Sequence, residues 1–487
     1  MTLSRCAAGA LYAAAISIGL AACGGNNDDH NTPVVEETRP QDARTFTAST
    51  ATTFAPLAGS SVVTDRWAGV LNGASYQIEV PATWNGMLVM WAHGYAGTGP
   101  NLPPNSIPIM RRYLLDNGYA WASSSYTKNY YDVRAGVEDT NALAINFTAL
   151  AAGNGRTLAT PSKIFITGIS MGGHITAAAI EAEARQTAVN KVSYAGAVPM
   201  CGVVGDTELF NYFAGYQVTA QQLAGFPITS FPTTDFETLA PVIRSSLWTT
   251  YPASAAVPGV TNSQGDKLKN AVSYLSGGPR PFYEEGFASS SNQNNIFASL
   301  GGDGTIRGIL TQNVLDTTQL FYKIDASSPD VTALDTAFNA SAFDIVPTPG
   351  ANRLRSDGLR WIPVVNGDIS VPVVTLHTLG DLFVPFKMEQ VYAARTKAKG
   401  TDRFLVQRAI RDVGHCAFTA AEATTAFDDM IKWEAGGPKP AGDDVTTPAV
   451  IADPKYGCTF TNNTPSAEDY TAPATRAAFQ ARYPSCS

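Results

Sequence analysis

The chain has 487 residues, of which 45% are hydrophobic and 15% are charged. These fractions are typical of a globular protein, and the length allows one large domain or two to three ordinary ones. The formal net charge is −8 and no basic run is longer than Arg111-Arg112, so nothing in the composition indicates a partner that is a nucleic acid.

The N-terminus is typical of an export signal. Arg5 is the only charge before an apolar segment that ends in Leu20-Ala21-Ala22, directly ahead of Cys23. This segment is too short to span a bilayer, and its end resembles the lipobox of bacterial lipoproteins, so we expect residues 1–22 to be removed and Cys23 to be acylated. Residues 23–54 lack apolar periodicity and are predicted to be a disordered tether. The sequence thus predicts an exported protein whose only membrane contact, at the outer membrane or cell surface, is a lipid anchor.

Between about residues 67 and 202, short apolar segments alternate with segments of helical spacing. Strands are predicted at 76–80, 87–92, 119–125, 164–167 and 192–198, and helices at 107–115, 137–150 and 171–185. Strands that alternate with helices indicate an α/β fold in which a mostly parallel sheet is flanked by helices. We therefore take residues 55–204 as the first part of the core.

The alternation stops at residues 205–362, where Gly, Ser, Thr, Asn and Pro are frequent. A structureless loop of this length is improbable in a compact domain, so this segment is predicted to be an inserted lid or cap with helices of its own. The second part of the core, at 363–435, has predicted strands at 371–376 and 404–409 and helices at 385–397 and 420–433. Residues 436–487 are predicted to be an extension that contains two cysteines.

The strongest chemical signal is Gly168-Ile169-Ser170-Met171-Gly172, which matches the pattern G-x-S-x-G. In this motif the serine lies on a sharp strand-to-helix turn, where only glycine allows the neighbouring elements to approach. The pentapeptide follows a short apolar strand and precedes an Ala-rich helix, which is the context that the motif requires. Ser170 is therefore the candidate nucleophile.

A serine hydroxyl needs a base that takes its proton. The candidates are the five histidines of the chain, His30, His93, His174, His377 and His415. Because motifs of this type follow the chain order serine, acid, histidine, we select His415, in the loop after the last predicted strand. We expect His174, on the same helix as Ser170, to pack there.

The acid should lie between Ser170 and His415. Asp381 directly follows a predicted strand and precedes a helix, where a carboxylate can orient the imidazole and stabilise its charged form. Asp206 and Asp368 are the alternative acids.

Two backbone N–H groups should hold the oxyanion of a reacting carbonyl. Met171, directly after the candidate nucleophile, supplies one, and the loop after the first central strand is expected to supply the other from Tyr95. Gly94 would let the backbone come close, and we expect His93 to support this loop without transferring a proton.

This ordered set of His93-Gly94, the pentapeptide around Ser170, Asp381 and His415 resembles the α/β-hydrolase superfamily of esterases, lipases and related peptidases. The resemblance covers about residues 67–435 apart from the insertion. It implies a serine hydrolase that cleaves a carboxylic ester, small or polymeric, through an acyl-serine intermediate and with no cofactor. The aromatic-rich, charge-poor insertion leads us to expect an apolar or aromatic pocket.

The remaining cysteines Cys201, Cys416, Cys458 and Cys486 form an even set, as in an oxidising compartment, and none has the spacing of a metal site. Of three pairings we favour Cys458 with Cys486, which would staple the extension. Tannase- and feruloyl-esterase-like enzymes place one Cys before the serine and another after the histidine. Here Cys416 follows the histidine but Ile169 precedes the serine, so Cys201 is the predicted partner of Cys416 and would hold the histidine loop.

Two other functions stay open. An amidase or peptidase uses the same triad, and Glu284-Glu285 could read a free amino terminus. A non-catalytic surface binding lipoprotein could also use this fold, and a broken triad would indicate it.

Overall fold

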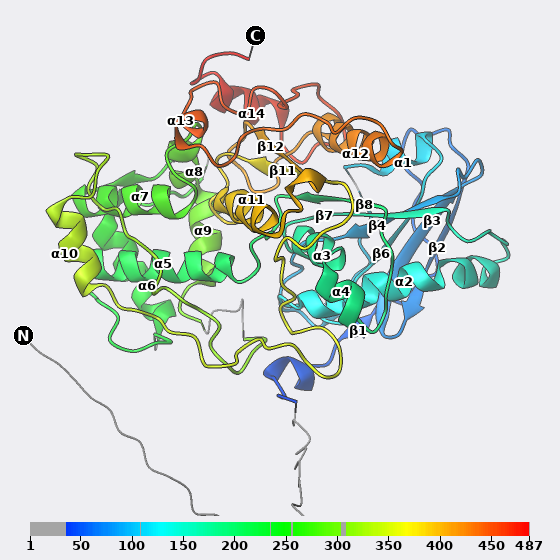
Figure 1. The fold of residues 1–487 in the computed structure, drawn as a ribbon, viewed down its shortest axis with the longest axis horizontal. Coiled ribbons are helices and arrows are strands. Elements are labelled where there is room, and N and C mark those ends of the chain that lie inside the picture. Colours follow the sequence, from blue (N-terminus) through cyan, green and yellow to red (C-terminus); the bar gives the residue numbers. More distant parts are fainter. Residues whose placement is uncertain (1–35, 108, 234, 255–256, 303–307, 487) are drawn as a thin grey trace, which may run out of the picture. The chain divides into compact units, whose positions relative to one another are not determined.

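The computed structural model describes residues 36–107, 109–233, 235–254, 257–302 and 308–486 (Figure 1). Residues 1–37 are one unit and Thr38–Ser487 are another, and the fold below is that of the second unit. The predicted signal peptide, Cys23 and residues 24–35 of the predicted tether lie outside the described residues. Their assignments stay predictions of the sequence.

The core is an eight-stranded sheet in the order β12-β11-β8-β7-β4-β6-β3-β2. The strands are β2 (Thr64–Leu71), β3 (Ala74–Pro81), β4 (Met87–Ala92), β6 (Ala120–Ser124), β7 (Lys163–Ile169), β8 (Gly196–Met200), β11 (Val373–Thr378) and β12 (Leu405–Ile410). β3 is antiparallel to both of its neighbours, and every other pair of neighbours in this sheet is parallel. The predicted mostly parallel sheet is confirmed.

Helices cover both faces of the sheet, because the central strands are apolar on both sides. In β4, Leu88 and Met90 pack in the hydrophobic cluster that also contains α2 and α3 residues, whereas Val89 and Trp91 pack on the opposite side. The flanking helices are α1 (Arg111–Asp116), α2 (Val133–Gly153), α3 (Met171–Ala179), α4 (Ala182–Thr187), α11 (Lys387–Lys399) and α12 (Ala420–Glu434). Residues of α2, α3 and α11 lie in one cluster and residues of α1 and α12 in the other.

One predicted helix is divided in the structure, and one strand was not predicted. The helix predicted at 171–185 is two helices, because Glu181 has extended backbone angles and caps the start of α4. Glu181 is buried and accepts backbone N–H bonds from Gly367 and Asp368, which fixes this break from a distant segment. The edge strand β2 was not predicted, since only two of its eight residues are buried and its apolar signal is weak.

The segment between β8 and β11 forms its own helical layer beside the sheet (Figure 1). It contains α5 (Glu208–Leu223), α6 (Phe236–Leu247), α7 (Ser263–Leu275), α8 (Tyr283–Phe287), α9 (Ser290–Ser299) and α10 (Ala333–Ser341), with the short strands β9 (Trp248–Thr250) and β10 (Val260–Thr261). The long helix α5 packs against α6 and α7. The insertion therefore has a helical core, although its sequence periodicity is weak.

The predicted tether at 23–54 is wrong for residues 38–54, which pack on the core. Arg39 is buried, donates to Asp132 at 2.8 Å and lies 3.5 Å over the ring of Trp361. A 3-10 turn (Pro40–Ala43) and strand β1 (Thr47–Ala48) follow, and β1 pairs with β5 (Asn101–Leu102). These residues are held by polar and cation–π contacts, which produce no apolar periodicity in the sequence. The lack of that periodicity had suggested disorder.

The extension after α12 returns to the core through α13 (Pro448–Ile451) and α14 (Pro473–Gln480). Arg476 of α14 forms a buried ion pair with Glu422 at 2.5 Å. The structure joins Cys458 to Cys486 and Cys201 to Cys416, the two favoured pairings, and such disulfides are typical of an oxidising compartment.

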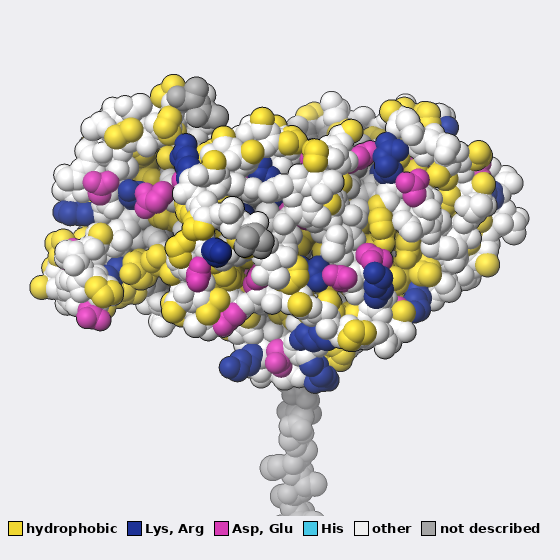
Figure 2. Space-filling model, turned by 90° about the horizontal axis from the view of Figure 1, so that it is seen from above, with side chains coloured by type: hydrophobic (Ala, Val, Ile, Leu, Met, Phe, Trp, Pro, Cys, Tyr) yellow, Lys and Arg dark blue, Asp and Glu magenta, His cyan; other side chains and the backbone are white. Residues whose placement is uncertain are grey.

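Within the described part of the chain, no helix has the length and apolar character needed to cross a membrane. On the face seen in Figure 2, basic side chains are interspersed with acidic and hydrophobic ones.

Candidate active site

Ser170 lies on a tight turn between β7 and α3. Its φ of 58° and ψ of −123° are a backbone conformation that side chains disfavour, and such strain is held only where the surroundings fix it. The fixing contact is the end of β4: a Cβ at Gly172 would lie 2.0 Å from the Ala92 carbonyl oxygen, and one at Gly168 would lie 2.5 Å from it. Both glycines of the motif are required because this strand approaches so closely.

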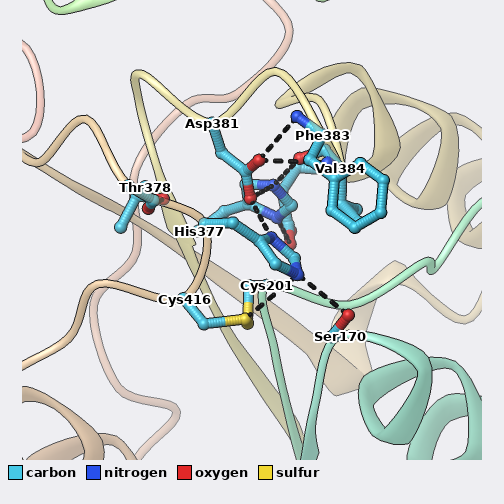
Figure 3. Close-up of a disulfide and its surroundings, with 11 residues drawn as sticks. Ser170, Cys201, His377, Thr378, Asp381, Phe383, Val384 and Cys416 are labelled. Atoms are coloured by element: carbon cyan, nitrogen blue, oxygen red, sulfur yellow. Dashed lines mark hydrogen bonds and ion pairs between the residues drawn. A yellow bond between two sulfur atoms is a disulfide. The ribbon is translucent and has the colours of Figure 1, made fainter. Parts of the chain in front are cut away.

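The structure brings Ser170, His415 and Asp381 together, and Figure 3 labels the serine and the aspartate of this group. His415 Nε2 lies 2.8 Å from Ser170 Oγ, and His415 Nδ1 lies 2.5 Å from Asp381 Oδ2. Asp381 is fully buried, and the His415 side chain is 16% exposed. With the carboxylate bonded at Nδ1, that nitrogen carries the proton and Nε2 is left to accept the one on the serine.

The Asp381 carboxylate is held in place by its own loop. Its second oxygen, Oδ1, accepts backbone N–H bonds from Phe383 at 2.9 Å and Val384 at 3.0 Å. The alternative acid Asp206 lies elsewhere, since it pairs with Arg395 at 2.7 Å. Asp368, the other alternative, lies in a different loop. Its backbone N–H and that of Gly367 donate to the carboxylate of Glu181.

The loop after β4 passes directly beside the serine. A Cβ at Gly94 would lie 3.2 Å from Ser170 Cβ, so a larger residue there would be crowded and the serine would have to shift slightly. Met171 is the first residue of α3, where an N–H has no partner within the helix. The loop thus carries Tyr95 next to the serine, while the donor roles of Tyr95 and Met171 stay predictions.

His93 supports this loop. Its ring is buried and stacks on Tyr126 at 4.1 Å, its Nδ1 lies 2.6 Å from the Gly94 carbonyl oxygen, and Tyr126 donates to the His93 carbonyl at 3.0 Å. Burial lowers the pKa of His93, which keeps its ring neutral. His174 is likewise buried, between the Tyr131 hydroxyl and the Pro363 carbonyl, and packs as expected.

The disulfide between Cys201 and Cys416 lies against His415. Cys416 follows His415 directly, and its sulfur lies 3.4 Å from His415 Nε2. Cys201 follows β8, and its N–H donates to the Leu376 carbonyl of β11. The bridge therefore ties the histidine loop to the end of the sheet. His415 and these two sulfurs are close enough to hold a metal ion, but in the disulfide neither sulfur is a thiolate.

Two aromatic rings that we did not predict line the approach to His415. Phe383 meets the histidine ring edge to face at 5.4 Å, and Phe213 of α5 stacks on Phe383 at 5.8 Å. Phe213 also lines a pocket in the insertion together with Phe210 and Phe231. The aromatic-rich composition of the insertion was a sequence signal for Phe213, whereas Phe383 lies outside the insertion and had none.

The acidic pair Glu284-Glu285 is engaged elsewhere. Glu285 accepts a hydrogen bond from Tyr483 at 2.6 Å, and Glu284 pairs with Lys269 at 2.9 Å.

The sheet has eight strands and is mostly parallel. A serine lies on the turn after β7, an aspartate after β11 and a histidine after β12, which is the arrangement typical of one fold. The chain has the α/β-hydrolase fold. No protein-family model matches the sequence.

The chain is similar to an o-phthalyl amidase from Xanthobacter agilis, with 23% identity over 406 residues that cover 74% of this chain and 85% of that protein. Among solved structures, it is similar to feruloyl esterase B from Aspergillus oryzae, with 15% identity, a TM-score of 0.39 and coverage of 82% of this chain and 86% of that one. A rice cell wall degrading esterase from Xanthomonas oryzae has 15% identity, a TM-score of 0.31 and coverage of 76% and 87%.

Proposed function

We propose that this α/β-hydrolase-fold protein is a hydrolase that cleaves carboxylic esters through an acyl intermediate on Ser170. The observation that carries the proposal is the continuous hydrogen-bonded series from Asp381 through His415 to Ser170. A buried carboxylate, an imidazole of fixed orientation and a hydroxyl within bonding distance are the parts that acyl transfer needs.

In the proposed reaction, Ser170 Oγ attacks the substrate carbonyl while His415 Nε2 takes its proton. The carbonyl oxygen becomes an oxyanion, which the N–H groups of Met171 and Tyr95 would stabilise. His415 then gives its proton to the leaving group, and the acyl group stays on Ser170. A water molecule, deprotonated by His415, releases the acid and restores the serine.

The aromatic wall beside His415 favours a substrate with an aromatic or apolar acyl group. Phe383 contacts the histidine ring and Phe213 stacks on Phe383. The described residues that line the pocket beside Phe213 include no charged side chain. Aromatic groups stack favourably on such rings. The o-phthalyl amidase relative, whose name gives an aromatic acyl group, supports the same preference.

An amidase is the second candidate, because that relative is named for cleavage of an amide. A peptidase that reads a free amino terminus through Glu284-Glu285 is less well supported. Glu285 is bonded to Tyr483 and Glu284 to Lys269, so neither carboxylate is held ready for an amine.

The test is hydrolysis of p-nitrophenyl acetate, butyrate and benzoate beside the matched anilides. We expect the wild type to cleave the esters, benzoate included, and Ser170→Ala to lose turnover by several orders of magnitude. Ser162→Ala, which changes an exposed serine on the loop before β7, serves as the matched control and should keep full activity.

Faster turnover of the anilides would identify an amidase. Wild-type protein that cleaves neither class and does not react with a fluorophosphonate probe would exclude a serine hydrolase and favour a binding protein.

A further inference from the structure

A second buried imidazole lies behind the Asp381 carboxylate, and the mechanism above does not use it. His377, near the end of β11, is fully buried. Its Nε2 lies 2.8 Å from the Val384 carbonyl oxygen, and its Nδ1 lies 3.3 Å from Oε1 of Glu389, a buried residue of α11. Figure 3 shows His377 beside Asp381, on the side away from Ser170.

The hydrogen bonds of His377 and Glu389 indicate which of their atoms carry protons. A carbonyl oxygen only accepts, so Nε2 of His377 must donate to Val384. Oε2 of Glu389 accepts from the Thr375 hydroxyl and from the Gln407 amide, each at 2.6 Å. These two donors favour an ionised carboxylate, so Nδ1 of His377 must donate as well.

His377 is therefore an imidazolium in a buried ion pair with Glu389. Burial by itself would lower the pKa of His377, but the hydrogen bond and charge of Glu389, with the charge of Asp381, raise it above its ordinary value. An ionised pair is tolerated here because its hydrogen bonds are satisfied.

The imidazolium faces the oxygen that bonds the catalytic histidine. His377 Nε2 lies 3.9 Å from Asp381 Oδ2, and the same Oδ2 lies 2.5 Å from His415 Nδ1. His377 also fixes Asp381 indirectly: it bonds the carbonyl of Val384, whose N–H donates to Asp381 Oδ1 at 3.0 Å.

We propose that His377, kept positively charged by Glu389, is a positioning residue that holds Asp381 ionised and sets the pH at which His415 becomes a base. The inference rests on the proposed function, since it concerns the same triad. The carboxylates of Asp381 and Glu389 both stabilise the protonated form of His415. The positive charge of His377 cancels the effect of one of these two negative charges.

The other titratable side chains around this group do not change charge between about pH 5 and about pH 9. Arg280 faces Asp381, and burial lowers its pKa only to about 10. Tyr212 faces Asp381, Tyr392 and Tyr456 face Glu389, and burial raises the pKa of all three phenols. Phe386 packs edge-on against the His377 ring and carries no charge.

The test is the pH dependence of kcat/KM for p-nitrophenyl butyrate. His377→Gln keeps a donor for the Val384 carbonyl but removes the positive charge, so protonated His415 is stabilised and we expect the acid limb to move up by about one pH unit. The double variant, His377→Gln with Glu389→Gln, removes one charge of each sign. Its acid limb should return toward that of the wild type.

A role in packing alone would lower activity in both variants without this reversal. An unchanged acid limb in His377→Gln, or a limb that stays displaced in the double variant, would overturn the inference. The proposed function would survive such a result as long as wild-type turnover is lost in Ser170→Ala, so the two failures are distinguishable.

A measurement on the wild type covers the case in which the variants do not fold. In protein labelled with ¹⁵N-histidine, we expect the imidazole of His377 to keep both nitrogens protonated to a higher pH than a free histidine, since Glu389 raises its pKa, whereas burial lowers the pKa of His93 and His174. A His377 imidazole that loses its proton at or below the pH of a free histidine would contradict the ion pair with Glu389.

Discussion

At the scale of single residues, the contacts of Asp381 fix the orientation and the tautomer of His415. One carboxylate oxygen accepts two backbone N–H groups and the other accepts from His415. Because every one of these contacts comes from a donor, the side chain must be an acceptor on both sides. An amide of the same shape could not satisfy both.

Asp381→Asn should therefore lower kcat by about 10⁴-fold. The amide oxygen must face the N–H groups of Phe383 and Val384, which turns the NH₂ toward His415 Nδ1. That nitrogen then accepts, Nε2 carries the proton, and the ring cannot take the proton of Ser170. Steady-state kinetics on a p-nitrophenyl ester measures the loss.

Asp368→Asn is the matched control, because Asp368 is the alternative acid and Asp381 alone bonds the histidine. Full activity of Asp381→Asn, or an equal loss in Asp368→Asn, would show that the acid is misassigned.

At the scale of elements, the site depends on loops that different strands hold together. The turn after β7 carries the serine, the loop after β11 the aspartate and the loop after β12 the histidine. The disulfide between Cys201 and Cys416 joins two such segments across 215 residues of sequence. A histidine loop fixed in this way keeps the imidazole at bonding distance from the serine.

We expect the two disulfides to differ in their effect on activity. Replacement of Cys201 and Cys416 by alanine should lower kcat/KM by about 10- to 100-fold, since small displacements of a catalytic group are costly. Replacement of Cys458 and Cys486, which bridge the extension, should leave the activity of the folded protein almost unchanged. Each pair of changes should lower the free energy of unfolding by roughly 2–5 kcal/mol.

Kinetics on samples whose folded fraction is known from circular dichroism separates the two effects. Equal activity per folded molecule in both double variants would contradict a positioning role for the bridge beside His415.

At the scale of the whole molecule, buried polar contacts fasten segments that are distant in sequence. Arg39 reaches Asp132 near the N-terminal end of the described chain, and Arg476 reaches Glu422 near the C-terminal end. Asp139 of α2 accepts instead from the backbone N–H and the hydroxyl of Thr127. Burial raises the pKa of Asp139 to about 6, despite these hydrogen bonds.

The stability of the molecule should therefore depend on pH through Asp139. The folded protein holds this proton more tightly than the unfolded chain, so the contribution is present at low pH and is lost as the pH rises from about 4 through about 6. Between about pH 5 and about pH 7.5, wild type should lose about 1 kcal/mol of unfolding free energy relative to Asp139→Asn. Urea denaturation of both proteins at the two pH values measures it.

The amide oxygen of the variant can still accept from Thr127, so the change isolates the charge. A difference between the two proteins that does not vary with pH would show that Asp139 titrates normally.

Local sequence determined the elements that build the sheet and the order of the catalytic candidates. Met87–Ala92 was predicted as a strand at its observed bounds, because a continuous apolar run is what a strand buried on both faces requires. The turn at Ser170 could be predicted because close approach of β4 leaves glycine as the only choice at Gly168 and Gly172. Such signals are local, because the burial or the backbone conformation of a position restricts which residue type can stand there.

The tertiary structure alone decided which distant side chains meet. His377 gave no sign in the sequence that it lies 3.9 Å from Asp381, and Phe213 gave none that it stacks on Phe383. Residues 38–54 read as disordered because their contacts, such as that of Arg39 with Asp132, are polar and span 93 positions. A hydrogen bond or ion pair between remote segments leaves no periodic pattern in either one, so only the folded chain reveals it.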